Sequence, residues 1–331
     1  MERAGNAAGT AAGTAAGTAA GTAAGSAAGT AAGTAASTAA GSAAGTAACT
    51  AATDDVAKKI DNTNPVLEAF GNAKTRNNDN SSRFGKYLKV FLDGDNNVLG
   101  AEADTYLLEK VRVVQRDPAE RNYHIFYMML EGMEDKQLEA RHLTRKPAEE
   151  AVYKYKYLAA EAAALTGWNP TQAFKKLSEK LVAVCINSGD IDSLYNVLAA
   201  IIHCGQVGIT LDQNNSATID ERDGPIGHVA KLLGVTDVKK LIKCICEARS
   251  EPRSAAKPPA QITYTKRPLE VARNALDTMA KYLYVQYFGS ARRVSARRHL
   301  RFTRCRRRAL ERTLSQWLAG TGTSSSSSSN S

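Results

Sequence analysis

The residues best suited to chemistry lie in one short polar segment, NDNSSRFGK at 78–86. It offers adjacent hydroxyl groups at Ser81 and Ser82 and a guanidinium at Arg83. A hydroxyl oxygen suits a hard cation such as Mg²⁺, and side-chain amides can donate hydrogen bonds to phosphate oxygens. The segment therefore suggests a contact to phosphate or magnesium, although its composition alone fits an ordinary Asn/Ser turn better.

A β-hairpin is predicted immediately after this loop. Residues 83–93 (RFGKYLKVFLD) alternate aromatic or aliphatic side chains with lysine, and residues 94–97 supply turn chemistry before a second strand. Helices are predicted where apolar residues recur at helical intervals, with Pro and Gly marking several ends. The predicted helices span 107–115, 120–130, 170–187, 190–204, 225–233, 236–248 and 267–288, and the Pro-, Ala- and Lys-rich stretch at 249–266 is predicted to be an exposed connection.

Other reactive side chains fit structural roles better than catalytic ones. His124, His203 and His228 each fall in or beside an apolar helical pattern, which is typical of core or capping histidines. The six cysteines show no paired metal spacing, and Cys244 and Cys246 make only C-x-C. Reduced thiols are therefore expected, and no zinc site.

Only part of the chain has the composition of a folded domain. Residues 7–52 repeat AAGT with small variations and contain no charged, aromatic or large aliphatic side chain, so they cannot offset the entropy of ordering. Frequent glycine and the lack of Leu, Ile, Phe and Val also argue against a membrane span or a signal peptide there. We predict a disordered repeat at 1–53, a folded region at 54–289 and a disordered tail at 290–331.

The net charge of +10 is concentrated in that tail. Ten arginines, no lysine and one acid lie between Gly289 and Thr313, so the rest of the chain is close to neutral. An arginine-rich segment can bind RNA or another polyanion weakly and without sequence preference, by counterion release. A non-enzymatic polyanion-binding protein is therefore an alternative function.

Four segments of the chain, in order, resemble the myosin motor domain: NPVLEAFGNAKT at 64–75, NDNSSRFGK at 78–86, TYLLEKVRVV at 105–114 and ERNYHIFY at 120–127. The second resembles the nucleotide-binding loop called switch I. Looser matches follow in the same register, which makes the Tyr/Lys alternation at 153–157 a structural segment and not a nucleic-acid strand. The resemblance covers about 56–288 and implies a partial myosin head related to P-loop NTPases, α/β but mostly helical, with the hairpin as part of its transducer sheet.

The resemblance also implies a role for each residue of the loop. Asn78 would contact the nucleotide phosphates, and Ser82 would ligate Mg²⁺. Ser81 would lie beside the γ-phosphate and the attacking water, and Arg83 would form a salt bridge with a glutamate of a second loop, switch II. The implied cofactors are ATP and Mg²⁺, the implied partner is the actin filament, and the implied location is the cytoplasmic actin cytoskeleton.

The chain departs from the family pattern in two ways. The family usually has Arg directly before the first Asn of switch I, whereas here Asn77 stands there and Arg76 lies one residue earlier. Furthermore, no G-x-x-x-x-G-K-[ST] phosphate loop and no DIxGFE switch II motif occur in the sequence. We therefore expect an incomplete motor that does not hydrolyse ATP, with Arg83 lacking its switch II partner and with apolar surfaces left uncovered. A structural remnant that binds actin weakly is a third reading.

Overall fold

The computed structural model describes residues 58, 61–94, 98–145, 153–158, 167–184, 188–250 and 263–291, which belong to one compact unit. The described residues form mainly helices, with four antiparallel sheets of two strands each. This confirms the prediction of a mostly helical fold with a small β component. The repeat at 1–53 and the tail beyond Ala291, both predicted to be disordered, lie outside the described residues.

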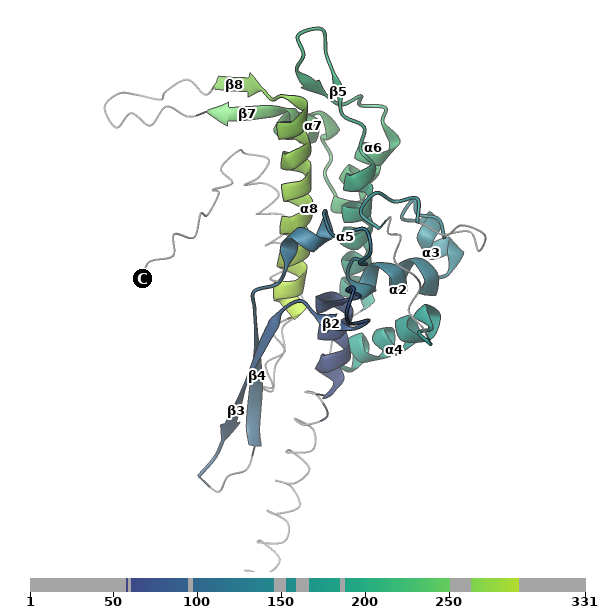
Figure 1. Cartoon of the computed structure of the whole chain (residues 1–331), viewed down its shortest axis with the longest axis vertical. Helices are drawn as coiled ribbons and strands as arrows, with labels where there is room; N and C mark the ends of the chain where they lie inside the picture. The colour runs from purple at the N-terminus through teal and green to yellow at the C-terminus, as the bar shows by residue number, and fades with distance from the viewer. Residues whose placement is uncertain are drawn as a thin grey trace, which may run out of the picture. The chain divides into compact units, whose positions relative to one another are not determined.

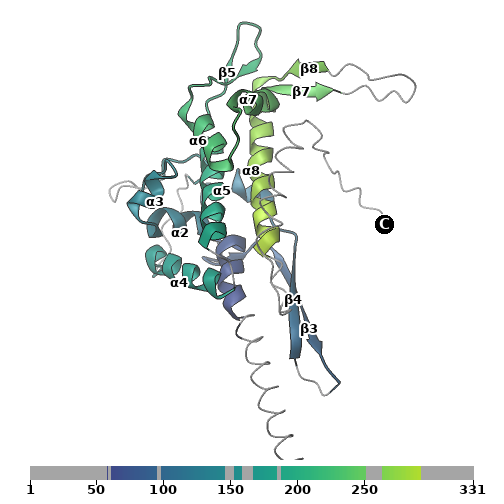
Figure 2. The same ribbon diagram turned by 180° about the vertical axis from the view of Figure 1, so that it is seen from behind.

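Two long helices, α5 (Ser188–Gln206) and α8 (Leu269–Ala291), pack against each other, as Figures 1 and 2 both show. Helix α6 (Gly224–Leu233) packs on α5. Helix α2 (His124–Gly132) packs against α4 (Pro170–Ala183). All five were predicted, and their ends differ from the predictions by at most four residues.

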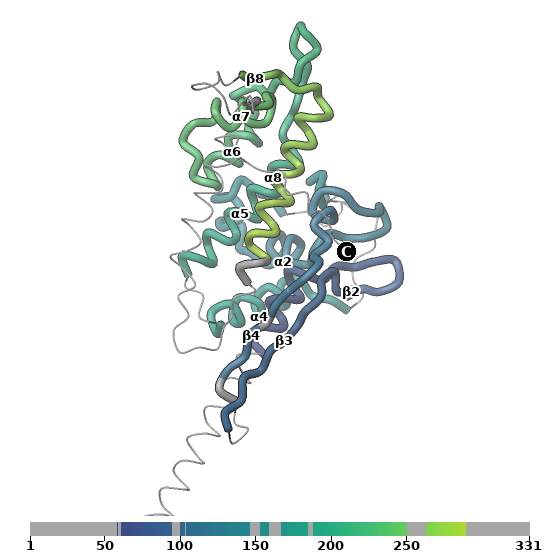
Figure 3. Tube along the Cα trace, turned by 90° about the vertical axis from the view of Figure 1, so that its left-hand side faces the viewer, coloured from purple at the N-terminus to yellow at the C-terminus, as the bar shows by residue number. Residues whose placement is uncertain are grey.

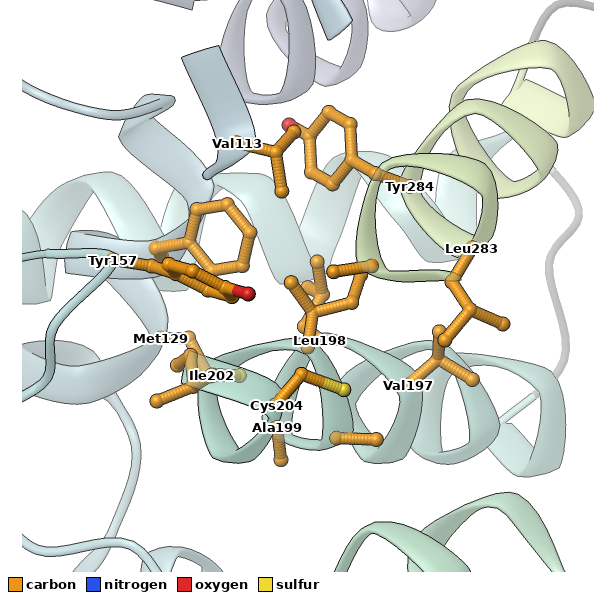
Figure 4. Close-up of a cluster of buried hydrophobic side chains, with 14 of the residues drawn as sticks. Val113, Met129, Tyr157, Val197, Leu198, Ala199, Ile202, Cys204, Leu283 and Tyr284 are labelled. Carbon is orange, nitrogen blue, oxygen red and sulfur yellow. The ribbon is translucent and has the colours of Figure 1, made fainter. Parts of the chain in front are cut away.

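The core between these helices is built from aromatic and aliphatic side chains (Figure 4). Leu198 and Ile202 of α5 are fully buried because they repeat at helical spacing on the face toward the core. Tyr284 of α8 stacks on Tyr123, with ring centroids 4.9 Å apart, and its hydroxyl donates to the carbonyl of Phe70 at 2.6 Å. This stacked pair ties α8 to the segments around residues 70 and 123.

Local capping fixes several helix ends. Asn169 accepts a hydrogen bond from the Gln172 amide at 3.0 Å, and a proline follows as the first residue of α4. Asp237 accepts from the Lys240 amide at 3.0 Å at the start of α7 (Val238–Cys246). Helix α6 ends at Gly234, whose φ of +70° is the left-handed conformation that glycine tolerates best.

The predicted hairpin is present as β3 (Gly85–Leu92) and β4 (Val98–Tyr106), paired antiparallel and running away from the helices (Figure 3). Every residue of β3 is exposed, including five large apolar side chains. None of the described residues covers them. The exposed side chains are Tyr87, Leu88, Val90, Phe91 and Leu92. Uncovered apolar surface is what we expected of a partial motor, because such strands are normally packed on at least one face.

The prediction of a helix at 107–115 is wrong. Residues Lys110–Val113 form only a short 3₁₀ helix, η1, and Leu107 precedes it with a φ of +54° and 93% of its surface exposed. The cause is tertiary, because Glu109 is held on both its backbone and its side chain. Its amide donates to the carbonyl of Arg83 at 3.0 Å, and its carboxylate accepts from the Arg83 guanidinium at 2.6 Å. This anchoring prevents a regular helix from starting earlier.

The connection predicted at 249–266 is partly wrong as well. Its two ends pair as β7 (Glu247–Ser250) and β8 (Thr263–Lys266), and α7 ends at Cys246 for that reason. Residues 251–262 lie outside the described part. Five other short elements were not predicted: α3 (Asp135–Glu139), β5 (Thr210–Leu211), β6 (Ala217–Thr218), β1 (Asn72–Ala73) and β2 (Ser81–Ser82).

The side chain of Asn122 is buried and joins three chain segments by hydrogen bonds. It is fully buried, and its amide nitrogen donates to the carbonyls of Val113 and Tyr157, both at 2.9 Å. Its side-chain oxygen accepts from the Tyr123 amide at 2.8 Å. Tyr157 itself is buried and donates its hydroxyl to Asp277 of α8, which confirms that the tyrosines at 153–157 are structural.

Three histidines from separate segments form a cluster in which His203 is buried, His228 is half-buried and His142 is exposed. The rings of His142 and His228 stack with centroids 3.9 Å apart, and the ring of His203 meets His228 at 4.8 Å. His203 donates its Nε2 proton to the carbonyl of Arg141 at 2.9 Å, and Lys231 lies 3.2 Å from Nε2 of His142. Burial lowers the pKa of His203 to about 4, and it also lowers the pKa of His228. The charged groups that act on the rings are Lys231 and Asp223, whereas Arg141 offers only its carbonyl and pairs its guanidinium with Asp192.

Replacing Asn122 by Ala should lower the free energy of unfolding by about 3 kcal/mol, because two buried carbonyls lose their donor. Urea unfolding followed by circular dichroism measures the change. The control Asn214→Ala, in the exposed β5–β6 turn, should change it by less than about 0.5 kcal/mol. Equal effects of the two substitutions would contradict the role given to Asn122.

Stability should fall in acid because burial keeps His203 and His228 neutral in the folded state. Their folded pKa values lie below the ordinary value of about 6.5, so the unfolded chain binds protons first and stability is lost as pH drops from about 6.5 toward 4. His203 alone accounts for at most about 3 kcal/mol of this loss. His203→Gln, which keeps a donor for Arg141, should flatten the pH dependence, whereas His299→Gln should not. Urea unfolding of the unmodified chain that is unchanged between pH 7.5 and 5 would rule this out.

Candidate active site

The 78–83 loop is closed by a short backbone ladder. Strand β2 (Ser81–Ser82) pairs antiparallel with β1 (Asn72–Ala73), directly after the helical residues 61–71. Between the strands, the Thr75 amide donates to the carbonyl of Asn78 at 2.8 Å. The loop is therefore a hairpin-like turn with a defined conformation, and not an extended linker.

Phe84 packs the end of the loop onto the preceding helix. A Cβ atom on Gly71 would lie 2.3 Å from the Phe84 ring, so this close approach requires glycine. The Phe84 ring also meets Phe288 of α8 edge-on, with centroids 5.1 Å apart. The apolar anchor sets where the polar residues just before it lie.

The structure brings the four predicted site residues together at this turn. The Asn78 side-chain oxygen accepts from the Asn80 amide at 2.8 Å, which leaves its NH₂ group to donate outward. Ser82 is exposed and donates its hydroxyl to the carbonyl of Phe84 at 3.0 Å. The hydroxyl oxygen of Ser81 accepts from the Arg83 guanidinium at 3.2 Å. As successive residues of a strand, the two serines leave the backbone on opposite sides.

Arg83 has an acidic partner that the sequence analysis did not identify. Its Nε donates to Glu109 at 2.6 Å, and the same carboxylate oxygen accepts from Nε of Arg112 at 2.8 Å. Arg112 is almost completely buried and also pairs with Glu120 at 2.7 Å. The two arginines and two glutamates form one neutral network beneath the loop. The signal available in the sequence was the presence of Glu109 and Arg112, three residues apart, in the mainly apolar run TYLLEKVRVV.

Opposing effects set the ionisation of this network. Burial alone would raise the pKa of Glu109, but hydrogen bonds from Arg83 and Arg112 and their positive charges lower it below its ordinary value. Burial likewise disfavours the charged form of Arg112, and the hydrogen bonds to Glu109 and Glu120 outweigh it and raise the pKa. Glu109 and Arg112 therefore both stay charged near neutral pH.

Arg76 points to a different partner. Its guanidinium forms an exposed ion pair with Asp117 at 2.7 Å, so it does not pair with Ser81 or Ser82. Asp117 also accepts from the Ala119 amide, and this bond and the Arg76 contact lower the pKa of Asp117. The shift of this arginine by one residue relative to the family pattern thus removes a positive charge from the loop itself.

Behind the loop, Asn80 makes contacts that the sequence analysis also missed. Its side-chain oxygen accepts from Nδ2 of Asn72 at 3.0 Å and lies 3.1 Å from Nε2 of His124. His124 and His203 are both buried, which confirms their placement in the core. The described residues contain no group of three or more His, Cys, Asp or Glu side chains placed to hold a metal ion.

The cysteine thiols, the membrane-span search and the arginine-rich tail concern parts of the chain away from the loop. Burial raises the pKa values of the Cys244 and Cys246 thiols, the latter to about 11, so both are protonated at neutral pH. No helix within the described ranges is long and apolar enough to cross a bilayer. The arginine-rich segment predicted to bind polyanions lies outside the described residues.

The chain was compared with known proteins. The family model of the myosin head (motor domain) matches residues 26–293. Myosin-52 of Schizosaccharomyces pombe is 36% identical over 236 residues, which are 70% of this chain and 15% of that protein. Unconventional myosin-Ih of Homo sapiens is 36% identical over 227 residues, 68% of this chain and 21% of that protein.

Myosin-2 of Saccharomyces cerevisiae is 34% identical over 234 residues, 71% of this chain and 14% of that protein. The chain thus spans between 14% and 21% of the length of these relatives. Because the family model matches most of the chain and the similarity to each relative extends over about two thirds or more of it, this chain belongs to the myosin head family of cytoskeletal motors.

Proposed function

We propose that residues 78–83 are the switch I half of a Mg²⁺-ATP site in an actin-based motor. The observation that carries the proposal is the turn itself, which gathers one amide and two hydroxyl side chains and is anchored by Phe84 and Glu109. Phosphoryl transfer requires mainly positioning and charge neutralisation from a protein. An ordered polar loop of this kind is suited to both tasks.

Each side chain suits one part of that work. The outward NH₂ group of Asn78 would donate to a phosphate oxygen, and Ser81 would orient the γ-phosphate and the attacking water. The exposed hydroxyl of Ser82 donates its proton to the carbonyl of Phe84, and its oxygen lone pairs remain available to bind Mg²⁺. Bound Mg²⁺ would neutralise phosphate charge at this place.

Arg83 would couple the loop to the rest of a motor. In this chain its guanidinium rests on Glu109, whose carboxylate is shared with buried Arg112. A carboxylate from switch II would compete with Glu109 for the same donors. We propose that the Glu109 contact keeps switch I ordered while that second carboxylate is away.

The chain supplies one side of the site. The sequence contains no G-x-x-x-x-G-K-[ST] loop to surround the β- and γ-phosphates. We therefore propose that the chain by itself binds Mg²⁺-ATP at the loop without hydrolysing it. Actin filaments are the proposed partner, and the actin cytoskeleton is the proposed location, both by family membership.

Binding of a fluorescent ATP analogue to the full chain tests the metal role of Ser82. Saturable binding should require Mg²⁺, and Ser82→Ala should weaken it by roughly tenfold, the value of one metal or charge-assisted contact. The matched control is Ser193→Ala on α5, whose hydroxyl also donates to a backbone carbonyl, at 2.8 Å. Binding that ignores Mg²⁺, or that both variants weaken equally, would count against the proposal.

The role of Glu109 can be tested separately. Glu109→Gln removes the charge shared by Arg83 and Arg112 and should lower the free energy of unfolding by about 2 kcal/mol. Amide hydrogen exchange should also speed up across residues 81–84, because the loop loses its anchor. The exposed control Glu139→Gln should leave both quantities unchanged. Unaltered exchange at 81–84 in Glu109→Gln would refute the anchoring role.

A further inference from the structure

Strand β3, which runs away from the helices (Figure 3), has one apolar face that no other described residue covers. Alternate residues of a strand point to the same side, so Leu88, Val90 and Leu92 share this face. Their surfaces are 38%, 47% and 52% exposed. On the opposite face, the charged Lys89 lies between two aromatic residues. The face of Leu88, Val90 and Leu92 is therefore the more continuous apolar surface.

The end of helix α8 lies beside the start of this strand (Figures 1 and 2). The ring of Phe288, near the end of α8, meets the ring of Phe84 edge-on, with centroids 5.1 Å apart. Phe84 directly precedes Gly85, the first residue of β3. The 40 residues that follow Ala291 therefore leave the helix close to the strand that carries the exposed face.

One stretch of those 40 residues has a regular apolar pattern. In CRRRALERTLSQWLA at 305–319, large apolar side chains recur at intervals of four, three and one. They are Leu310, Leu314, Trp317 and Leu318. Such spacing is typical of a helix with one apolar side. The pattern therefore predicts a segment that is stable only when this side packs against another apolar surface.

Length and charge both suit a contact between this segment and β3. Leu310 follows Phe288 by 22 residues, and a linker of that length has an r.m.s. end-to-end distance of roughly 26 Å, about the length of an eight-residue strand. The hairpin at 85–106 carries two lysines and four acids, a net charge of −2. The segment at 305–319 carries four arginines and one acid, a net charge of +3. Because the two are joined covalently at an effective concentration on the order of 1 mM, even a weak contact would form.

We propose that residues 305–319 fold back onto β3 and cover the face formed by Leu88, Val90 and Leu92. The apolar side of the segment and this face then remove each other from water, which is favourable. An uncovered apolar edge strand is a template for association between chains, so the contact also keeps copies of the chain apart. The proposal does not depend on nucleotide binding at residues 78–83.

Trp317 reports this contact, because the chain has only one other tryptophan, Trp168. In the full chain carrying Trp168→Phe, the emission of Trp317 should lie at shorter wavelength, and be quenched less by acrylamide, than in a synthetic peptide of residues 305–319. Leu88→Ser combined with Val90→Ser should weaken the contact by at least about tenfold, because two apolar side chains are lost from it. The emission and quenching of Trp317 should then approach those of the peptide.

The matched control is Tyr87→Ser combined with Phe91→Ser, which removes two large side chains from the opposite face of the same strand and should leave Trp317 unchanged. Quenching of Trp317 equal to that of the peptide would overturn the proposal, and so would equal effects of the two pairs of substitutions. Protection that increases with protein concentration would also overturn it, since the segment would then bind another copy. If Trp168→Phe does not fold, the difference between the unmodified chain and Trp317→Phe gives the same emission.

Discussion

The buried guanidinium of Arg112 is the constraint around which the candidate site is assembled. Only 2% of its side chain is exposed, and its charge is met by Glu109, Glu120 and the carbonyl of Arg121. An uncompensated charge in such a place costs several kcal/mol, so the two segments that carry these groups, 109–112 and 120–121, must stay together. Arg83 joins them through Glu109, and the loop is therefore anchored by a charge balance that the core itself requires.

Asn80 extends this order to the other side of the turn. The loop is held at its C-terminal end by the ion pair between Arg83 and Glu109. It is also held by the contacts of Asn80 to Asn72 and His124. Asn78 and Ser82 are exposed on this turn, and they are the residues that we propose contact a ligand. A loop fixed on two sides loses little entropy on binding, which is the physical meaning of a preorganised half-site.

The helical region and the hairpin differ in how completely they are packed. The helices share a continuous core whose residues run from Val66 to Phe288, whereas all of β3 is exposed. The chain spans 14% to 21% of the three relatives compared above, and it contains the loop that we propose as one half of a nucleotide site. It also carries apolar strand surface that, in a longer protein, other strands would be able to cover.

The sequence by itself determined most of the long helices, the hairpin and the position of the polar loop. Regular spacing of apolar residues, with signals such as Pro170 and Gly234, is local information, and so is the order NDNSSRFGK. Only the tertiary structure decided that Glu109, 26 residues from Arg83, would take its guanidinium, and that 107–115 would shorten to a 3₁₀ turn. The same holds for the β7–β8 pairing and for the His124–Asn80 contact. Charge pairs and strand pairs between distant residues depend on where the core places each backbone, and no local pattern encodes that placement.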